Sequence, residues 1–311
     1  MAPLVEQSLR AIQRGSKSFA LAAQLFDPTT REGAILLYAW CRYCDDQIDE
    51  QTLGFRTARP SSESAGDRLA PLERETCRAL AGEAVEEPAF AALQEVVRRH
   101  TIPDRHPLDL LKGFAMDVEG RRYESLDECC QYCYHVAGVV GVMMAYVMGV
   151  RGEDTLDRAS DLGIAFQMTN IARDVVDDAD AGRVYLPGDW LREAGVPIAE
   201  ITRPEHRPAV SSVALRLLEE AERYYASAEL GLARLPFRSA WAVASARRVY
   251  RDIGRLVRDR GPRAWDRRVS TGRGRKILLT LAAAGDAAAA IRRRSEKTPM
   301  PRDGLWTRPH D

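Results

Sequence analysis

Apolar side chains recur along most of this chain at spacings of three and four residues, the period of a helix with one buried face. Breaks rich in proline, glycine and serine separate the helical stretches. No stretch shows the strict alternation of a half-buried strand, and no solenoid repeat is present. We therefore expect an all-α fold, with a single helical domain over 1–295 and a Pro/Arg-rich tail over 296–311. The predicted helices span 4–15, 30–49, 69–82, 88–99, 107–118, 125–149, 154–178, 209–233, 238–260 and 273–294, with a loop over 56–67.

The helix predicted over 154–178 carries its polar side chains in an unusual way. It is apolar nearly all round, and one narrow stripe holds acids and amides: Gln167, Asn170, Asp174, Asp177 and Asp178. A surface helix would show water a broad polar face, so a narrow stripe indicates a polar cavity inside the protein. The clustered carboxylates repel one another, so we expect a cation to share that cavity.

A second helix repeats this arrangement. Over 30–49 one face carries Tyr38, Arg42, Asp45 and Asp49, again after a strongly apolar segment. Both helices place carboxylates at i and i+4, and Arg42 and Arg173 lie just upstream of the acids. Two such helices facing each other would form a site of hard oxygen ligands, which suits Mg²⁺ or Mn²⁺. The alternative for either cluster alone is a solvated acidic helix end.

Composition and charge narrow the class of protein. The 311 residues include 45 basic and 45 acidic side chains, so no overall field favours nucleic acid as a partner. The N-terminus lacks a basic and then apolar signal sequence, so we expect no export. Six cysteines in a chain of this length are not a disulfide framework, and a cytoplasmic location fits them better.

The central helix permits more than one interpretation. From Cys129 to Val150 there are 22 residues without a charged side chain, which is long enough to cross a membrane. Polar residues crowd its first third, so a buried core helix is favoured. Small residues recur every four positions, and they indicate either close helix packing or the wall of an apolar tunnel. They are Ala137, Gly141, Ala145 and Gly149.

Two Cys-x-x-Cys pairs have the spacing of zinc ligands. Cys41 and Cys44, like Cys130 and Cys133, lie inside apolar helical runs and lack the glycine-containing turns of zinc knuckles. Small core residues are the favoured interpretation, with zinc binding as the alternative.

Several segments together resemble the squalene/phytoene synthase family, and within it the bacterial phytoene synthases of carotenoid pathways. The matching segments cover about residues 15 to 290. They are SKSF at 16–19, YAWCR at 38–42, DDQID at 45–49, YCYHVAGVVG at 132–141, the acidic stretch 167–178, RVYLP at 183–187, VYRDIG at 249–254 and RGPRAWDRR at 260–268. Asp177 stands where many relatives carry Glu, which keeps the charge.

The resemblance implies a class I isoprenoid synthase bundle around a central cavity, and a prenyltransferase activity that joins two geranylgeranyl diphosphates head to head into phytoene. It implies that metal ions are held by Asp45, Asp49, Asp174 and Asp178, with Asp46 and Asp177 as nearest supports. Gln167 and Asn170 would orient metal-bound water or diphosphate. The implied diphosphate contacts are Lys17, Ser18, Arg42, Arg173 and Arg267.

An apolar tunnel would shelter the carbocation from water. The residues implied for its wall are Phe19, Val136, Val140, Gly141, Leu162 and Phe166, shaped by Tyr38, Tyr132, Tyr185 and Tyr250. We expect no NADPH requirement. Because substrate and product are long hydrocarbons, we expect peripheral contact with the inner face of the membrane, and association with other carotenoid enzymes is a further expectation. Squalene or dehydrosqualene synthesis from the shorter farnesyl diphosphate, and a non-catalytic helical scaffold, are the competing hypotheses.

Overall fold

The computed structural model describes residues 4–9, 22–49, 51–52, 55–56, 65–293 and 302–310, and within these ranges it is built almost wholly of helices. The expected all-α architecture is therefore confirmed. Its long helices are α3 (Pro28–Asp49), α4 (Ala65–Leu80), α5 (Pro88–His100), α6 (Arg105–Val118), α9 (Glu153–Asp180), α11 (Arg207–Gly231), α12 (Phe237–Arg260) and α13 (Arg273–Arg292). Shorter elements are β1 (Gln51–Thr52), β2 (Phe55–Arg56), α7 (Leu126–Cys133), η1 (Tyr134–Gly138), α8 (Val139–Val147), α10 (Gly188–Glu193), η2 (Ile198–Glu200), η3 (Pro204–His206), η4 (Leu232–Arg234) and η5 (Gly261–Arg263).

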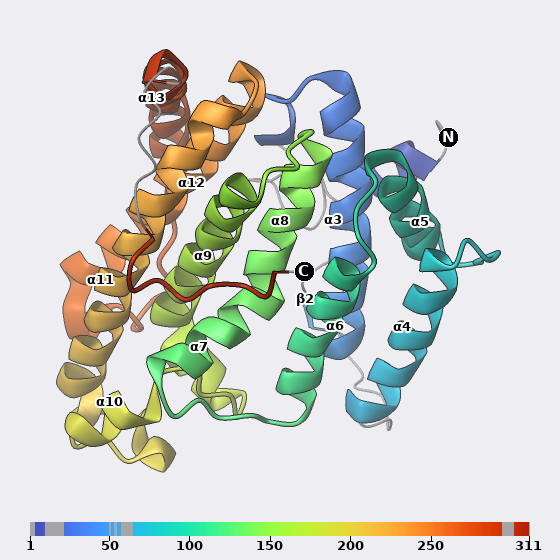
Figure 1. The fold of residues 1–311 in the computed structure, drawn as a ribbon. Coiled ribbons are helices and arrows are strands. Elements are labelled where there is room, and N and C mark those ends of the chain that lie inside the picture. The colour runs from blue at the N-terminus through green and yellow to red at the C-terminus, as the bar shows by residue number, and fades with distance from the viewer. Residues whose placement is uncertain are drawn as a thin grey trace.

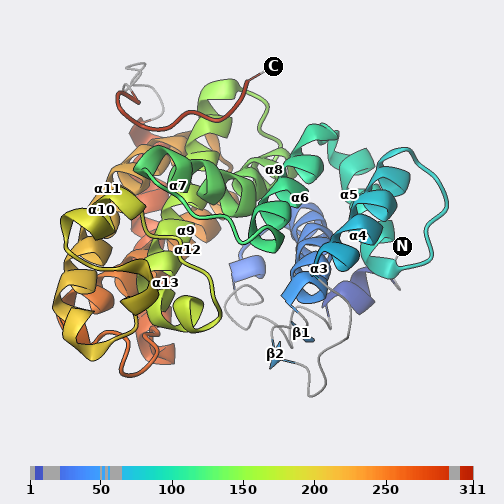
Figure 2. The same ribbon diagram turned by 90° about the horizontal axis from the view of Figure 1, so that it is seen from below.

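Two groups of helices flank a central pair (Figures 1 and 2). On one side α3 packs against α5, α4 and α8, and on the other α11, α12 and α13 pack in succession. The centre is formed by α9 together with the run α7–η1–α8. The apolar period of α3 explains its place, because Leu36, Leu37 and Trp40 are almost completely buried. This burial of apolar side chains stabilises the packing of α3 against its neighbours.

The central apolar stretch lies inside the bundle. Among the described helices, Leu126–Val147 is the one whose length and composition would allow it to cross a membrane, and most of it is buried by protein. A π-helical turn over Tyr134–Gly138 interrupts it. His135 is a satisfied core histidine, because its Nδ1 lies 2.9 Å from the carbonyl oxygen of Asp109.

Glycines bring the central helices unusually close together. A Cβ added to Gly141 would lie 2.2 Å from the carbonyl oxygen of Ala159, and one added to Gly163 would lie 2.2 Å from that of Ala137. Backbone on α9 therefore touches backbone on α8 and η1, which no larger residue would allow. This contact decides between the two interpretations of the small residues at Gly141. Close packing is correct there, and the predicted place of Gly141 in a tunnel wall is wrong.

Some element boundaries differ from those expected. The helix predicted from residue 69 begins at Ala65 and therefore contains Pro71. This proline removes one backbone donor, and the helix accommodates it on its exposed side. A two-residue antiparallel pairing of β1 and β2 lies next to the predicted loop, and β2 enters it at residue 56. Pairings this short carry too few residues for an alternating pattern to show.

The C-terminal segment 302–310 lies across α9 (Figure 1). Arg302 forms an ion pair with the fully buried Asp161, with Nη2 2.6 Å from Oδ1. The backbone N–H of Trp306 donates to the hydroxyl of Tyr224 at 2.9 Å. The guanidinium of Arg308 is also buried, where it pairs with Asp157 at 2.8 Å. This segment is therefore tied to the side of α9 that carries no predicted site residue.

Candidate active site

A cavity of about 420 Å³ opens between α3, α6, α7, α8 and α9. Residues from distant parts of the sequence meet there, as the helical periods predicted. The predicted residues that line it are Tyr38, Arg42, Asp45, Tyr132, Val136, Val140, Gln167, Asn170, Arg173, Asp174, Asp178 and Tyr185. Residues not predicted also line it: Cys41, Leu110, Phe114, Asp117, Ile171 and Arg183. The two acid-bearing helices thus face one hollow.

The α9 side of the cavity concentrates negative charge. Asp174 pairs with the neighbouring Arg173 and with Arg268, whose Nη2 lies 3.2 Å from Oδ2 of Asp174. Burial, followed by the nearby charge of Asp174, raises the pKa of Asp178 to about 7, although Arg183 and Arg173 oppose the rise. A cation beside this carboxyl group would stabilise its charged form.

On the α3 side of the cavity, an arginine holds the acid that faces the hollow. Nη1 of Arg42 lies 2.6 Å from Oδ2 of Asp45, and Nε lies 3.5 Å from Oδ1 of Asp46. Asp45 lines the cavity, whereas Asp46 is buried and does not. Asp49 follows one turn later in α3, and its side chain lies outside the described part of the structure. Arg42 therefore fixes the orientation of Asp45 toward the hollow.

The donor set of the cavity fits a hard divalent cation. Asp45, Asp174 and Asp178 offer carboxylate oxygens. The side-chain oxygen of Asn170 is buried and accepts no hydrogen bond from the residues that the structure describes. An orphaned buried amide oxygen one turn before Asp174 is a ready additional ligand. Oxygen donors alone, without sulfur or imidazole, are the ligands that Mg²⁺ and Mn²⁺ prefer.

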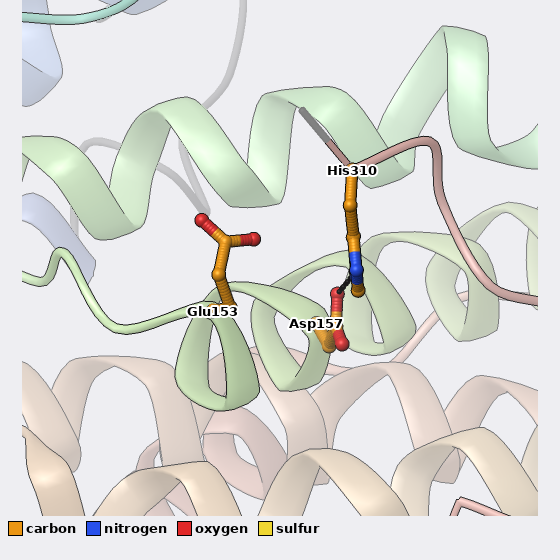
Figure 3. A group of neighbouring side chains, drawn as sticks. All are labelled: Glu153, Asp157 and His310. Atoms are coloured by element: carbon orange, nitrogen blue, oxygen red, sulfur yellow. Dashed lines mark hydrogen bonds and ion pairs between the residues drawn. The ribbon is translucent and has the colours of Figure 1, made fainter.

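A second group of acids meets a histidine elsewhere (Figure 3). Glu153, Asp157 and His310 bring their ligand atoms within 4.8 Å of one another. Arg308 pairs with both carboxylates, and Nε2 of His310 lies 2.8 Å from Oδ1 of Asp157. Asp157 precedes Asp174 by almost five helical turns, or about 25 Å. These residues attach the C-terminal segment to α9, and they take no part in the cavity.

Two tyrosines and an unpredicted acid form one wall of the cavity, and a third tyrosine packs beside them. The rings of Tyr132 and Tyr185 stack with their centroids 4.7 Å apart, and Tyr123 lies beside both. Asp117 accepts hydrogen bonds from the hydroxyls of Tyr185 at 2.8 Å and Tyr132 at 3.1 Å. The signal for Asp117 was present in the sequence, because it shares a helix face with the apolar Leu110 and Phe114, where an acid is out of place.

Four predicted residues are not among those that line the cavity. The ring centroids of Phe166 and Tyr250 lie 4.1 Å apart in a stacked arrangement, and these side chains and Leu162 are partly buried against the core. The half-buried Tyr250 still influences the site, because its neighbours include Asn170, Arg173 and Asp174. Asp177 is exposed and does not line the cavity, so its predicted place among the metal supports is wrong: the helical period turns it toward solvent.

Other predicted diphosphate contacts are placed differently or lie outside the described residues. Arg268, rather than Arg267, reaches Asp174, and the side chain of Arg267 does not line the cavity. The sequence could not separate two adjacent arginines in a loop, because no helical period applies there. Lys17, Ser18 and Phe19 fall outside the described residues.

Comparison with known proteins agrees with this geometry. Residues 12–275 match the family model described as squalene/phytoene synthase. Because that match covers most of the chain, the protein belongs to the squalene/phytoene synthase family.

Two relatives of similar length are named as phytoene synthases. The chain is 53% identical over 306 residues to a 15-cis-phytoene synthase of Pantoea ananas, covering 98% of each sequence. It is 52% identical over 310 residues to a 15-cis-phytoene synthase of Paracoccus sp., covering 100% of this chain and 99% of the relative. Among solved structures, a dehydrosqualene synthase in complex with a ligand superposes with a TM-score of 0.81 at 25% identity, covering 93% of this chain and 98% of that one.

Proposed function

We propose that this protein is a phytoene synthase, a prenyltransferase that condenses two molecules of geranylgeranyl diphosphate head to head. The observation that carries the proposal is the meeting of Asp45 on α3 with Asp174 and Asp178 on α9 around one cavity, in a chain whose full-length relatives are named phytoene synthase. The overall reaction releases two diphosphates and two protons for each phytoene, one proton in each of its two stages. It would be the first committed step of carotenoid biosynthesis.

The polar end of the cavity would hold the diphosphate groups. Divalent ions bound there would link the carboxylates to the leaving diphosphate and offset its developing negative charge. Arg42 and Arg173 keep Asp45 and Asp174 in place, and both guanidinium groups line the cavity. Arg183 adds a third cation beside Asp178. Charged donors of this kind form the strongest contacts with diphosphate oxygens.

The apolar part of the cavity would protect the allylic cation left by ionisation. Leu110, Phe114, Val136 and Val140 line this part and exclude water. The stacked faces of Tyr132 and Tyr185 offer electron-rich surfaces to a cation nearby. The double bond of the second substrate would attack this cation. Loss of a proton from the carbon that had carried the cation would then close the cyclopropane ring of prephytoene diphosphate. A second ionisation, rearrangement and a second proton loss would then give the triene. The two protons lost, one in each stage, leave with the two diphosphates and balance the reaction.

A second candidate function is the synthesis of dehydrosqualene from two farnesyl diphosphates. The specific observation in its favour is the superposition on a dehydrosqualene synthase. The two functions differ in the length of chain that the apolar part must take. Sequence identity of about half over the whole chain to proteins named phytoene synthase favours the longer substrate.

The proposal also covers the location of the enzyme in the cell and its partners. Substrate and product partition into lipid, so the protein would work as a peripheral membrane protein on the cytoplasmic face, where it could pass phytoene to the next carotenoid enzyme. Washing isolated membranes with alkaline carbonate should release it. No NADPH would be needed, since a reductant is required only where squalene is the product.

The test is the identity of the hydrocarbon. Purified protein is incubated with Mg²⁺ and either geranylgeranyl or farnesyl diphosphate, without a reductant, and the extract is analysed by chromatography and mass spectrometry. Phytoene from the longer substrate supports the proposal. Product from farnesyl diphosphate alone would transfer the assignment to dehydrosqualene synthesis, and no hydrocarbon from either would remove it.

A further inference from the structure

Helix α13 is amphipathic in the opposite sense to the other helices. The side chains that it turns toward the protein are alanines, Ala283, Ala287 and Ala290, which are buried. Three of its large aliphatic side chains are exposed to solvent instead: Ile277 is 55% exposed, Leu278 68% and Leu281 62%. Together with Phe237, these three are the large apolar side chains that the described residues expose. A cluster of this kind on a single helix face indicates a surface that another apolar phase covers.

The charges around this face are positive. Arg273 and Lys276 precede the apolar side chains, Arg275 between them is paired with Asp252, and Arg292 follows the apolar side chains. The sole acid within the sequence of α13, Asp286, is paired with Arg248, with Nη2 2.7 Å from Oδ1. An apolar helix face flanked by arginine and lysine is complementary to a bilayer with anionic headgroups, because the aliphatic groups enter the acyl region while the cations meet phosphate.

The position of α13 connects this face to the cavity. The helix lies at the outer edge of the bundle, on the side away from α4 and α5 (Figures 1 and 2). Its start is anchored where Thr271 and Arg275 both bond to the buried Asp252. The loop before it reaches the active site, since Trp265 donates to the carbonyl of Ala172 at 3.2 Å and Arg268 pairs with Asp174.

We propose that the exposed face of α13, formed by Ile277, Leu278 and Leu281 and flanked by its basic residues, docks the protein on an anionic lipid bilayer. The apolar side chains would enter the lipid, and the basic residues of the loop before α13 and of its first turn would meet the headgroups. Because that loop contacts α9 at Asp174, docking would hold the cavity close to the phase in which the substrates dissolve. This step rests on the proposed function, which supplies hydrocarbon substrates, whereas the docking itself is measured without catalysis.

The experiment is flotation of the full-length protein with vesicles of phosphatidylcholine alone or mixed with phosphatidylglycerol. The wild type should float with the anionic vesicles. The double substitution Leu278→Asp and Leu281→Asp should weaken this partition about ten-fold or more, since it removes apolar area and adds charge. Arg273→Glu should weaken it about ten-fold, and only on anionic vesicles. Arg74→Glu, the same charge change at an exposed position of α4, is the matched control and should float like the wild type.

Two further measurements, of folding and of turnover, distinguish a loss of docking from a general loss of structure or activity. All variants should retain the wild-type circular dichroism, because the changed side chains are exposed. They should also retain turnover of detergent-dispersed geranylgeranyl diphosphate, because none lines the cavity. Flotation of the wild type through this face without hydrocarbon synthesis would support docking while removing the proposed function.

Docking is overturned if an active wild type does not float, or if the double variant floats equally well. It is also overturned if the wild type stays in solution as a dimer that the double variant separates, since the face would then bind a second copy of the chain.

Discussion

The hydroxyl of Tyr185 donates a hydrogen bond to Oδ1 of Asp117 at 2.8 Å, joining α6 to the loop after α9 at the cavity wall. The other oxygen of the same carboxylate accepts from Tyr132 at 3.1 Å. One acid therefore fixes the two tyrosine rings that stack over the hollow. Asp117 acts as a positioning residue through these hydroxyls, and it also lines the cavity itself.

Substitutions of Asp117 should distinguish its role in positioning the two tyrosines from the effect of its negative charge. Asp117→Ala leaves two tyrosine hydroxyls without their acceptor, and should lower the free energy of unfolding by about 1–3 kcal/mol. We expect kcat to fall at least about ten-fold, because loosened rings no longer hold the reacting chains in register. Asp117→Asn should recover much of the stability. Glu119→Ala, an exposed acid at the end of the same helix, should change neither quantity, as measured by urea unfolding and product assay. A wild-type kcat in Asp117→Ala would contradict the positioning role.

The raised pKa of Asp178 predicts a pH dependence of stability in metal-free protein. Its folded pKa, about 7, exceeds its ordinary value of 3.8, so between these values the folded state binds the proton more strongly than the unfolded state. Stability should therefore fall as pH rises through this window. Asp178→Asn removes that penalty and should stabilise the protein in EDTA at pH 8 by about 1–3 kcal/mol, with no gain below pH 4.

The control for Asp178 is its exposed neighbour. Asp177→Asn should leave the unfolding free energy at pH 8 unchanged. Equal stabilisation by both substitutions would mean that general charge reduction, rather than burial beside Asp174, causes the effect.

The contact between α8 and α9 predicts a severe effect of one methyl group. Gly141→Ala places a Cβ 2.2 Å from the carbonyl oxygen of Ala159, so the helices must separate, at a cost of about 2 kcal/mol or more. Gly285→Ala, where nothing lies within 4 Å of the added Cβ, should instead stabilise α13 by up to about 1 kcal/mol. Thermal unfolding of the two variants compares them directly, and a higher melting temperature for Gly141→Ala would contradict the close packing.

The C-terminal segment predicts a long-range contribution to stability. Arg302→Ala leaves the fully buried Asp161 without its main cation, and should cost about 3 kcal/mol. Arg192→Ala breaks an ion pair with Glu124 in which both side chains are exposed, and it should cost less than about 1 kcal/mol. Urea unfolding followed by circular dichroism measures both, and equal effects would show that the segment contributes little to the fold.

The sequence predicted those features that depend on helical period. The helices over 30–49 and 154–178 were found within a few residues, because burial of an apolar face imposes a spacing that local sequence records. The same period placed Asp45, Asp174 and Asp178 toward a shared cavity. The period also misled at one point: Asp177 and Asp178 are adjacent, and only the packing of α9 decided that Asp178 faces inward.

Features that depend on distant partners were not predictable in this way. Asp117 meets Tyr185 only after the chain has folded, and an acid late in α6 could equally have faced solvent. The tie between Arg302 and Asp161 spans 141 positions, so nothing local marks it. The outward side chains of α13 follow a regular helical pattern, and which side faces the protein was decided by the alanines packed against α12.

The central claim is that the acids of α3 and α9 jointly hold a metal–diphosphate group. Calorimetric titration of the purified protein with Mg²⁺ in the presence of inorganic pyrophosphate tests it most directly, with Asp177→Asn as the control beside the cavity. We predict tight binding by the wild type and by Asp177→Asn, and binding weakened about ten-fold or more by either Asp45→Asn or Asp174→Asn. Unchanged binding in both cavity variants, or an equal loss in Asp177→Asn, would contradict the account.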